Sequence, residues 1–459
     1  MSSDNAKLQL IYGLDDRPPL PNALLAAVQH ILASIVGIVT PTLIIGGVLG
    51  LGENIPYLIA MSLFVSGVAT FIQCRRIGPV GSGLLSLQGT SFAFLGAILA
   101  AGFAVKGRGG TPEDILAMVF GLCLVGCVVE IILSQFVDKL ERIVNPTVTG
   151  IVITVIGLSL VKVGFTDLAG GATAGEDLGK PVNLILGFIV VAVILVVTFL
   201  GNPVLRISAI MVGLVVGTII AAVLGMVDPA PLSNAALFAL PQPLKFGLDF
   251  DIGLFVPFAF LYLVTAIETS GDLTANSVIS HQPIDGPVYM RRIKGGILGD
   301  GVNSGIAALF NTFPNTTFSQ NNGVIQMTGV ASRYVGYFIS LILVVMGLFP
   351  IIGSIFLLIP KSVLGGATLV LFGTIAVAGI RILSTQKMDL RRIYILAVSF
   401  GLGLGVTLVP DATQHLPAFL KQVVAAPITL AGLSAIILSL AIPETAVAAA
   451  QEPDVVSHG

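Results

Sequence analysis

The stretch Phe313-Pro314-Asn315-Thr316-Thr317-Phe318-Ser319-Gln320-Asn321-Asn322-Gly323 interrupts a long apolar part of the chain. Apart from its two Phe residues, it consists of polar residues, Pro and Gly. Lipid tolerates irregular backbone at membrane depth only where that backbone lines a cavity or is buried in protein. Polar contacts between helices would account for one or two such residues, but hardly for the whole cluster. The stretch therefore predicts a broken membrane segment that lines a binding cavity.

The side chains of this stretch suit a planar heterocyclic ligand. The carboxamides of Gln320, Asn321 and Asn322 offer donors and acceptors together. That combination matches a ring whose edge alternates C=O and N–H groups. The ring of Phe318 could stack on such a ligand.

The composition places the stretch in a polytopic membrane protein. Charged residues make up 10% of the 459 residues, against roughly 25% in a soluble protein. Apolar residues reach 55%, the mean hydropathy is +1.01 and the net charge is −2. A chain of this composition has too few polar residues to cover a water-exposed surface. Its net charge of −2 gives no positive surface that would attract nucleic acid. These numbers exclude a soluble enzyme, a nucleic-acid binder and a disordered scaffold.

The uncharged stretches are long enough to cross a bilayer as helices, which takes about 20 apolar residues each. They predict an all-α fold of fourteen transmembrane segments at 20–47, 56–74, 86–103, 113–136, 143–162, 181–201, 206–226, 252–271, 291–312, 315–331, 333–353, 360–381, 390–410 and 422–442. With the N-terminus in the cytoplasm, fifteen of the 22 Lys and Arg residues fall on the inner side, as the positive-inside rule requires. Both termini are then cytoplasmic.

Fourteen segments divide into two inverted repeats of seven, because an odd repeat length gives the halves opposite orientations. The third and tenth segments correspond in these repeats. Both are short, begin at Gly or Pro, and are rich in Ser, Thr, Gln or Asn. Such a pair is typical of a transporter's binding site, where half-helices point N–H groups and a positive dipole end at the substrate.

Ionisable residues within the predicted segments are costly, since a carboxylate at the bilayer centre costs roughly 2.5–3.5 kcal/mol on insertion scales. Glu268 follows the uncharged stretch 252–267, and Asp272 shares its helical face at i+4. Either Glu268 faces a polar cavity, where it accepts hydrogen bonds or carries a proton, or it ends a helix at the interface. His30 is either a neutral imidazole bonded to a neighbouring helix or a participant in proton coupling.

Other residues give little support to a metal, cofactor or anion site. Cys123 and Cys127 lie four residues apart in an apolar run, which indicates helix packing rather than a metal site. Both short segments lack Lys and Arg, which argues against a multivalent anion as ligand. No catalytic residue, metal or cofactor is expected. The absence of HExxH and GxSxG motifs from the sequence argues against a membrane-embedded enzyme.

Four motifs stand out along the chain. They are Gln320-Asn321-Asn322-Gly323 with Thr328 after four further residues, Gln88-Gly89-Thr90-Ser91-Phe92, Glu268-Thr269-Ser270-Gly271-Asp272, and His30 after Gln29. With these motifs the sequence resembles the nucleobase–ascorbate transporter family, most closely its bacterial xanthine permease branch. The resemblance runs from about residue 17 to 442.

The resemblance implies fourteen segments in two inverted repeats of seven, with short strands and half-helices in segments 3 and 10. Segments 1–4 and 8–11 would form a mobile core domain, and segments 5–7 and 12–14 a gate domain that also dimerises. The expected division is a cytoplasmic tail at 1–17, core at 18–142, gate at 143–251, core at 252–355, gate at 356–443, and a C-terminal tail at 444–459.

The resemblance also implies roles for single residues. Glu268 and Gln320 would hydrogen-bond a purine, and Phe318 would stack on it. The backbone around Phe94 and Ser319 would complete the cradle, together with the motif residue Gln88. The family positions tied to transport or proton coupling are matched by Asp272, Asp300, His30 and Asn321.

One position departs from the family pattern. Position 93 is Ala, whereas xanthine-selective relatives tend to carry Asn before the corresponding Phe. The smaller Ala93 side chain could admit the extra C8 carbonyl of uric acid. By the same resemblance, Gln320 in place of Glu implies a preference for a purine over uracil.

The expected function is proton-coupled uptake of xanthine, with uric acid or guanine as further candidates, across the bacterial inner membrane by alternating access. The expected partners are a purine nucleobase, protons, membrane lipids and a second copy of the chain, but no nucleic acid. A symporter for uracil or another nucleobase is the alternative. An anion carrier of the same architecture is disfavoured by the buried Glu268, and a passive channel by the matching broken segments.

Overall fold

The computed structural model describes residues 10–137, 145–172, 174–233, 236–417, 420 and 424–442. The expected C-terminal tail at 444–459 and the first nine residues of the N-terminal tail lie outside these ranges. The chain divides into two compact units, Met1–Val137 with Val163–Val370, and Asp138–Lys162 with Leu371–Gly459. The division into core and gate concerns parts that move against each other, and it stays a prediction.

Each of the fourteen predicted ranges overlaps one or more elements of the structure. The helices are α1 (Leu20–Leu49), α2 (Ile55–Arg75), α3 (Leu95–Gly107), α4 (Pro112–Leu133), α6 (Pro146–Leu168), α7 (Pro181–Phe199), α8 (Pro203–Ile207), α9 (Ala209–Val223), α10 (Ala230–Ser233), α11 (Ile252–Ile279), α12 (Gly286–Leu309), α13 (Ser319–Thr328), α14 (Arg333–Gly347), α15 (Pro350–Leu357), α16 (Lys361–Ser384), α17 (Leu390–Leu408) and α19 (Pro427–Ala441). Short 3-10 turns lie at Gly52–Asn54, Phe92–Phe94, Ser134–Phe136, Gly175–Asp177 and Pro410–Thr413.

Among the described residues, eight helices are long and apolar enough to cross a membrane, and a ninth crossing results if α14 and α15 count as one. The chain is therefore a mostly helical membrane protein. Fourteen crossings and the inverted repeats stay predictions.

Several helix ends differ by a few residues from the predicted segments, and two differences are larger. The eighth segment was expected to end at 271, but α11 continues to Ile279, so that Glu268 and Asp272 lie well inside a helix. The eleventh was expected to run through 333–353, but it breaks between α14 and α15 with a bend of 80°. Pro350 stands at the start of α15, where its missing N–H costs nothing.

Two short strands lie between the helices, as the family resemblance implied. β1 (Gln88–Thr90) and β2 (Asn315–Thr317) form an antiparallel pair in which Gln88 lies opposite Thr317. Each strand is followed by a helical segment, α13 after β2 and a 3-10 turn with α3 after β1. Because the strands are antiparallel, the two helical segments begin at opposite ends of the strand pair. Their N-terminal N–H groups therefore approach it from two sides.

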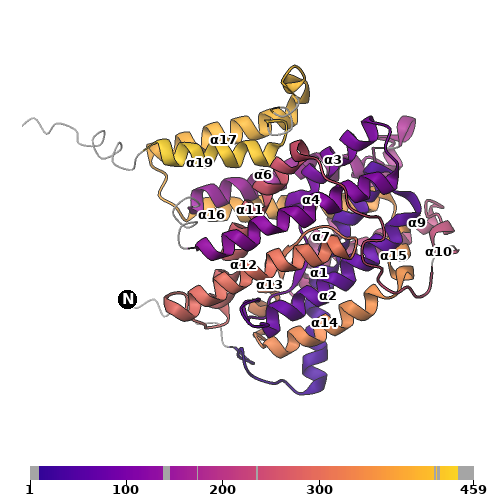
Figure 1. Cartoon of the computed structure of the whole chain (residues 1–459). Helices are drawn as coiled ribbons and strands as arrows, with labels where there is room; N and C mark the ends of the chain where they lie inside the picture. Colours follow the sequence, from indigo (N-terminus) through magenta and orange to yellow (C-terminus); the bar gives the residue numbers. More distant parts are fainter. Residues whose placement is uncertain are drawn as a thin grey trace, which may run out of the picture. The chain divides into compact units, whose positions relative to one another are not determined.

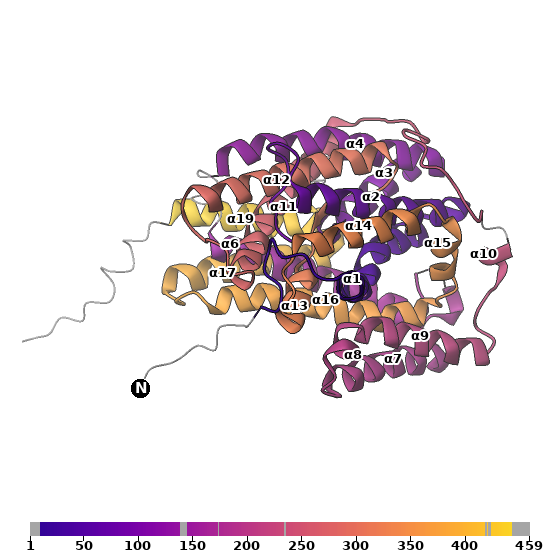
Figure 2. The same cartoon turned by 90° about the horizontal axis from the view of Figure 1, so that it is seen from below.

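Close helix packing surrounds this strand pair in the first unit. The helices α2 and α14 lie side by side, as do α4 and α12, and Figure 2 also shows α7 against α9 (Figures 1 and 2). A Cβ added at Gly67 would lie 2.7 Å from the backbone N of Val344, and one added at Gly301 would lie 3.0 Å from the backbone N of Ile131. Glycine at these two positions lets the helix backbones approach closely.

The second unit contains most of α6, the end of α16, and the adjacent helices α17 and α19 (Figure 1). A Cβ at Gly403 would lie 2.7 Å from Cβ of Ala431, which shows how closely α17 approaches α19. Arg391 of α17 donates from Nε to the carbonyl of Ile442 at 2.5 Å, at the C-terminal end of α19. A guanidinium there complements the negative end of the helix dipole.

Candidate functional site

The strand pair meets α11 and α12 through two carboxyl groups. Thr317 of β2 donates its hydroxyl to Oδ2 of Asp272 on α11, with 3.1 Å between the oxygens. Thr269, one turn earlier on α11, donates its hydroxyl to Oδ2 of Asp300 on α12. The two threonine hydroxyls lie 3.4 Å apart. Two acidic side chains from different helices are thus joined through a pair of hydroxyls.

Asparagine side chains fix the start of α13 against α11. Asn276 Nδ2 donates to the carbonyl of Leu85 at 2.8 Å and to Oδ1 of Asn322 at 2.9 Å. Asn322 Nδ2 in turn donates to the carbonyl of Asp272 at 3.1 Å, and Asn321 Nδ2 donates to Leu85 at 2.7 Å. These bonds hold the irregular backbone before and after the strands in place, since buried carbonyls need partners.

Of the residues expected to contact substrate, those on α11 and at the start of α13 are accessible. Ser319 is exposed, and Gln320, Glu268 and Asp272 are partly exposed. Hence Glu268 lies inside a helix and faces accessible space, rather than ending the helix at the interface. Ser319 is exposed as well, so the N-terminal end of α13 is accessible, as Glu268 on α11 is.

The aromatic residues expected in the cradle are buried. The ring of Phe318 is 6% exposed and occupies a slot beside two glycines. A Cβ at Gly89 would lie 2.4 Å from its Cζ, and one at Gly37 would lie 2.9 Å from its Cε2. The Phe94 ring packs at 4.6 Å between centroids on Tyr262, and Ala93 is 2% exposed. The glycines of α1 and β1 therefore determine where the Phe318 ring lies.

The remaining predicted residues are fully buried polar groups. Neither ring nitrogen of His30 has a hydrogen-bond partner of good geometry, although the side chain of Asn321 lies beside it. The carboxamide of Gln88 and Oδ1 of Asp300 are likewise buried without such a partner, and Gln88 lies beside Asp300. Unpaired buried polar atoms are costly, which makes these groups candidates for function.

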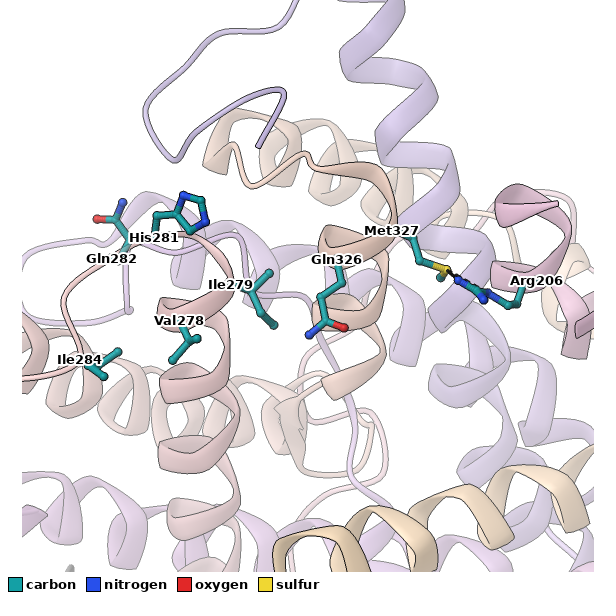
Figure 3. Close-up of a pocket in the computed structure, with 8 residues that line it drawn as sticks. All are labelled: Arg206, Val278, Ile279, His281, Gln282, Ile284, Gln326 and Met327. Atoms are coloured by element: carbon teal, nitrogen blue, oxygen red, sulfur yellow. Dashed lines mark hydrogen bonds between the residues drawn. The ribbon is translucent and has the colours of Figure 1, made fainter. Parts of the chain in front are cut away.

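A cavity of about 990 Å³ lies at the C-terminal ends of α11 and α13 (Figure 3). Val278 and Ile279 of α11 line one side, and Gln326 and Met327 of α13 line the other. Arg206 of α8 points its guanidinium at the Sδ atom of Met327, with 2.9 Å from Nη2.

An exposed face of α11 leads from Glu268 toward this cavity. Gly271, Ala275 and Val278 are exposed and follow Glu268 at helical spacing. On α13, the exposed or partly exposed positions Ser319, Gln320, Gly323 and Gln326 follow the same spacing. Both faces end at residues that line the cavity.

The predicted site residues do not include Asn276 and Thr269, which build this site, or the buried acid Glu130 near Asp300. Asn276 lies beyond the predicted end of its segment, so its distance from the motif concealed its role. Glu130 lies inside predicted segment 113–136, and an acid in an apolar helix is a signal that could have found it. The bonding role of Thr269 depends on α12 and has no sequence signal.

Comparison with known proteins agrees with the motifs. A family model described as a permease family matches residues 21–412. The chain is 45% identical to the xanthine permease XanP of Escherichia coli K12 over 440 residues, which is 95% of either chain. It is 43% identical to the xanthine permease XanQ of the same strain over 443 residues, 96% of this chain and 95% of XanQ.

Solved structures with low sequence identity share the fold. The transmembrane domain of the cyanobacterial bicarbonate transporter BicA matches 94% of this chain and 100% of its own, with a TM-score of 0.57 and 16% identity. The murine anion transporter Slc26a9 matches 91% of this chain and 68% of its own, with a TM-score of 0.55 and 14% identity. The chain is therefore a transporter rather than an enzyme, and it belongs to the permease family matched here, the nucleobase–ascorbate transporter family.

Proposed function

We propose that the protein takes up xanthine together with protons across the bacterial inner membrane. The observation that carries this proposal is the accessible pair of faces on α11 and α13, which lead from the cavity to Glu268 and Gln320. A carboxylate and a carboxamide together can bind the N–H and C=O groups on the edge of a purine dione. The naming of XanP and XanQ as xanthine permeases supports this substrate over other nucleobases.

In this proposal Glu268 and Gln320 contact the purine, and the Ser319 backbone N–H at the start of α13 contributes a further donor. Phe318 and Phe94 shape the site from behind, with Gln88 beside them. Ala93 leaves room for the C8 carbonyl of uric acid, so uric acid competes with xanthine.

Proton coupling would use the acidic residues behind the substrate. Asp272 lies one turn after Glu268 on α11, and it is linked through Thr317 and Thr269 to Asp300. Protonation of one of these carboxyls on the outside, and its loss on the inside, would tie substrate movement to the proton gradient. His30 and Asn321, which lie side by side, would adjust this network.

Alternating access would move the core, 18–142 and 252–355, against the gate, 143–251 and 356–443. The cavity lies on the side of α11 that the positive-inside rule places in the cytoplasm, so it would serve substrate release. The proposal includes fourteen crossings, cytoplasmic termini and a homodimer formed by the gate. BicA and Slc26a9 share this fold and carry anions, but we do not propose an anion as the substrate here. A carboxylate at the site, Glu268, disfavours an anionic substrate.

Ligand binding to the purified protein tests the substrate assignment. Xanthine should raise the melting temperature, and uric acid should compete, whereas uracil and bicarbonate should have no effect. Glu268→Gln should weaken xanthine binding by tenfold or more, about 1.4 kcal/mol, because it removes the anionic acceptor. Gln320→Ala should weaken binding or change the preference among purines.

Glu53→Gln, at an exposed carboxylate in the turn before α2, is the matched control and should bind xanthine normally. Stabilisation by uracil alone would replace the purine proposal with a uracil transporter. Normal xanthine binding by Glu268→Gln would remove Glu268 from the site.

A further inference from the structure

A buried acid on α4 plays no part in the proposed site. Glu130 lies in the last turn of α4 and is 0% exposed. Neither of its carboxyl oxygens has a hydrogen-bond partner of good geometry among the described residues, although the side chain of Thr265 on α11 lies beside them. An unpaired acid in the interior of a membrane protein is expensive, and such residues usually have a function.

The packing of α4 on α12 brings Glu130 to Asp300. A Cβ at Gly301 would lie 2.9 Å from Cγ1 of Ile131 and 3.0 Å from its backbone N. Glu130 and Asp300 directly precede these two touching residues, and their charges lie within interaction range of each other. The two acids therefore occupy one helix–helix interface.

No cation among the described residues faces this pair. The titratable groups around Glu130 are Glu268 and Tyr262 on α11, Asp300 on α12, and Cys127 on its own helix. Lys106 of the neighbouring α3 lies beside the start of α4, about 27 Å away along that helix. The 3-10 turn Ser134–Phe136 carries no titratable side chain.

The basic residues of α12 also lie elsewhere. Lys294 precedes Asp300 by more than one turn, and Arg292 donates to Gln282 at 2.9 Å. The four ion pairs found among the described residues include neither Glu130 nor Asp300. The interface therefore contains two acids and no compensating charge.

We propose that Glu130 and Asp300 share one proton, and that Glu130 is a proton-storing residue of the transport cycle. Two carboxylates buried in one interface without a cation are costly to ionise together, as in the paired acids of aspartic proteases. Transfer of the proton from the Glu130 carboxylic acid to the Asp300 carboxylate leaves Glu130 ionised and Asp300 protonated, and the reverse transfer restores the first state. The part in transport rests on the proposed function, whereas the shared proton does not.

Infrared spectroscopy of the purified, substrate-free protein tests the shared proton. The wild type should show a C=O band of a protonated carboxylic acid at neutral pH that shifts in D₂O. Glu130→Gln should lose or shift this band, because the remaining Asp300 then ionises against a carboxamide donor. Asp300→Asn should also change it, whereas Glu53→Gln should leave it unchanged. A band that is identical in the wild type and Glu130→Gln would overturn the proposal.

The pH dependence of xanthine uptake distinguishes proton storage by Glu130 from a purely structural role of this residue. In Glu130→Gln the pH of half-maximal xanthine uptake should move by at least one unit while KM stays within twofold. Glu130→Asp keeps a carboxyl and should restore most of the wild-type pH profile. If Glu130→Gln does not fold, Glu130→Ala, which also removes the carboxyl, replaces it in both assays. An unchanged pH profile would contradict the role in transport. Absence of xanthine uptake by the wild type would reject the proposed function, and the infrared result would still decide the shared proton.

Discussion

The hydroxyl oxygens of Thr269 and Thr317 lie 3.4 Å apart and join the carboxyls of Asp300 and Asp272 into one chain of polar groups. Each threonine has one proton, and in the ionised state each donates it to its own carboxylate. No hydrogen bond then connects the two hydroxyls. Protonating one carboxyl lets that acid donate to its threonine, which turns its own proton toward the other threonine. The chain can therefore pass a proton between the two helices.

Thr317→Val tests this chain, because valine keeps the shape of threonine and removes the hydroxyl. We expect proton-driven xanthine accumulation to fall by tenfold or more, about 1.4 kcal/mol, while xanthine binding stays within threefold. Uptake and binding are measured on the same preparation. Thr429→Val is the control, since its buried hydroxyl in α19 has no bonding partner among the described residues. Equal accumulation by wild type and Thr317→Val would exclude a transport role for the chain.

Gly89→Ala should displace the ring of Phe318. The added Cβ would lie 2.4 Å from Cζ of the ring and 2.9 Å from Cγ1 of Ile38, so something must shift. We expect weaker xanthine binding and a melting temperature several degrees lower. Gly96→Ala in the adjacent helix meets nothing within 4 Å and should be neutral or stabilising. If the added methyl group clashes with the Phe318 ring, Phe318→Leu should partly restore xanthine binding and stability to Gly89→Ala. Normal binding and stability of Gly89→Ala alone would contradict the role of Gly89 in placing the Phe318 ring.

Asn276→Ala should destabilise the protein, although Asn276 is not among the residues proposed to contact substrate. The buried Asn276 side chain donates to Leu85 and Asn322 and accepts from Ser280, so its loss leaves buried groups unpaired. A cost of about 1–3 kcal/mol follows, visible as a lower melting temperature in detergent. Asn22→Ala, which removes an exposed amide bonded to Tyr12, should have little effect. Equal melting temperatures for the two variants would count against the role of Asn276.

Asp251 gives a pH-dependent contribution to stability at the start of α11. Hydrogen bonding from Arg108, assisted by the N–H groups of Leu254 and Gly253, holds the pKa of Asp251 below its ordinary value. The ionised carboxylate therefore stabilises the fold above the unfolded-state pKa of about 3.9, and this contribution disappears as pH falls through the lowered folded-state pKa.

Asp251→Ala should accordingly lower the stability at pH 7 by about 0.5–2 kcal/mol, the usual value of a helix N-cap. The difference from wild type should shrink as the pH is taken below 4. Thermal unfolding across that range measures it. Asp251→Asn keeps an N-cap acceptor without the charge, so its stability relative to wild type isolates the pairing with Arg108. A difference that grows toward low pH would contradict this assignment.

Much of the fold could be predicted from the sequence because apolar length and charge spacing reflect the bilayer directly. The broken segment at 313–323 was recognised from its polar residues alone, and its structure as β2 followed by α13 agrees with that prediction. The bend after Gly347 was missed because hydropathy continues unchanged across it. The end of α11 was misplaced because Glu268 and Asp272 lower the hydropathy while the helix continues.

The site could be predicted only where a single residue stands out by its type. Glu268 in an apolar segment is such a residue. The pairing of Glu130 with Asp300 and the contact between Thr269 and Thr317 join segments far apart in sequence, so only packing reveals them. Likewise, the sequence does not distinguish Gly89 from the other glycines among the 53 in the chain. Its role becomes visible only in the structure, where the Phe318 ring lies against it.

Xanthine uptake into proteoliposomes with an imposed pH gradient is the most direct test of proton-coupled purine transport. With the outside more acidic, the protein should accumulate radiolabelled xanthine above equilibrium. A protonophore should abolish the accumulation, and unlabelled uric acid should compete. Uptake that only equilibrates, or that is indifferent to the gradient and the protonophore, would contradict proton symport.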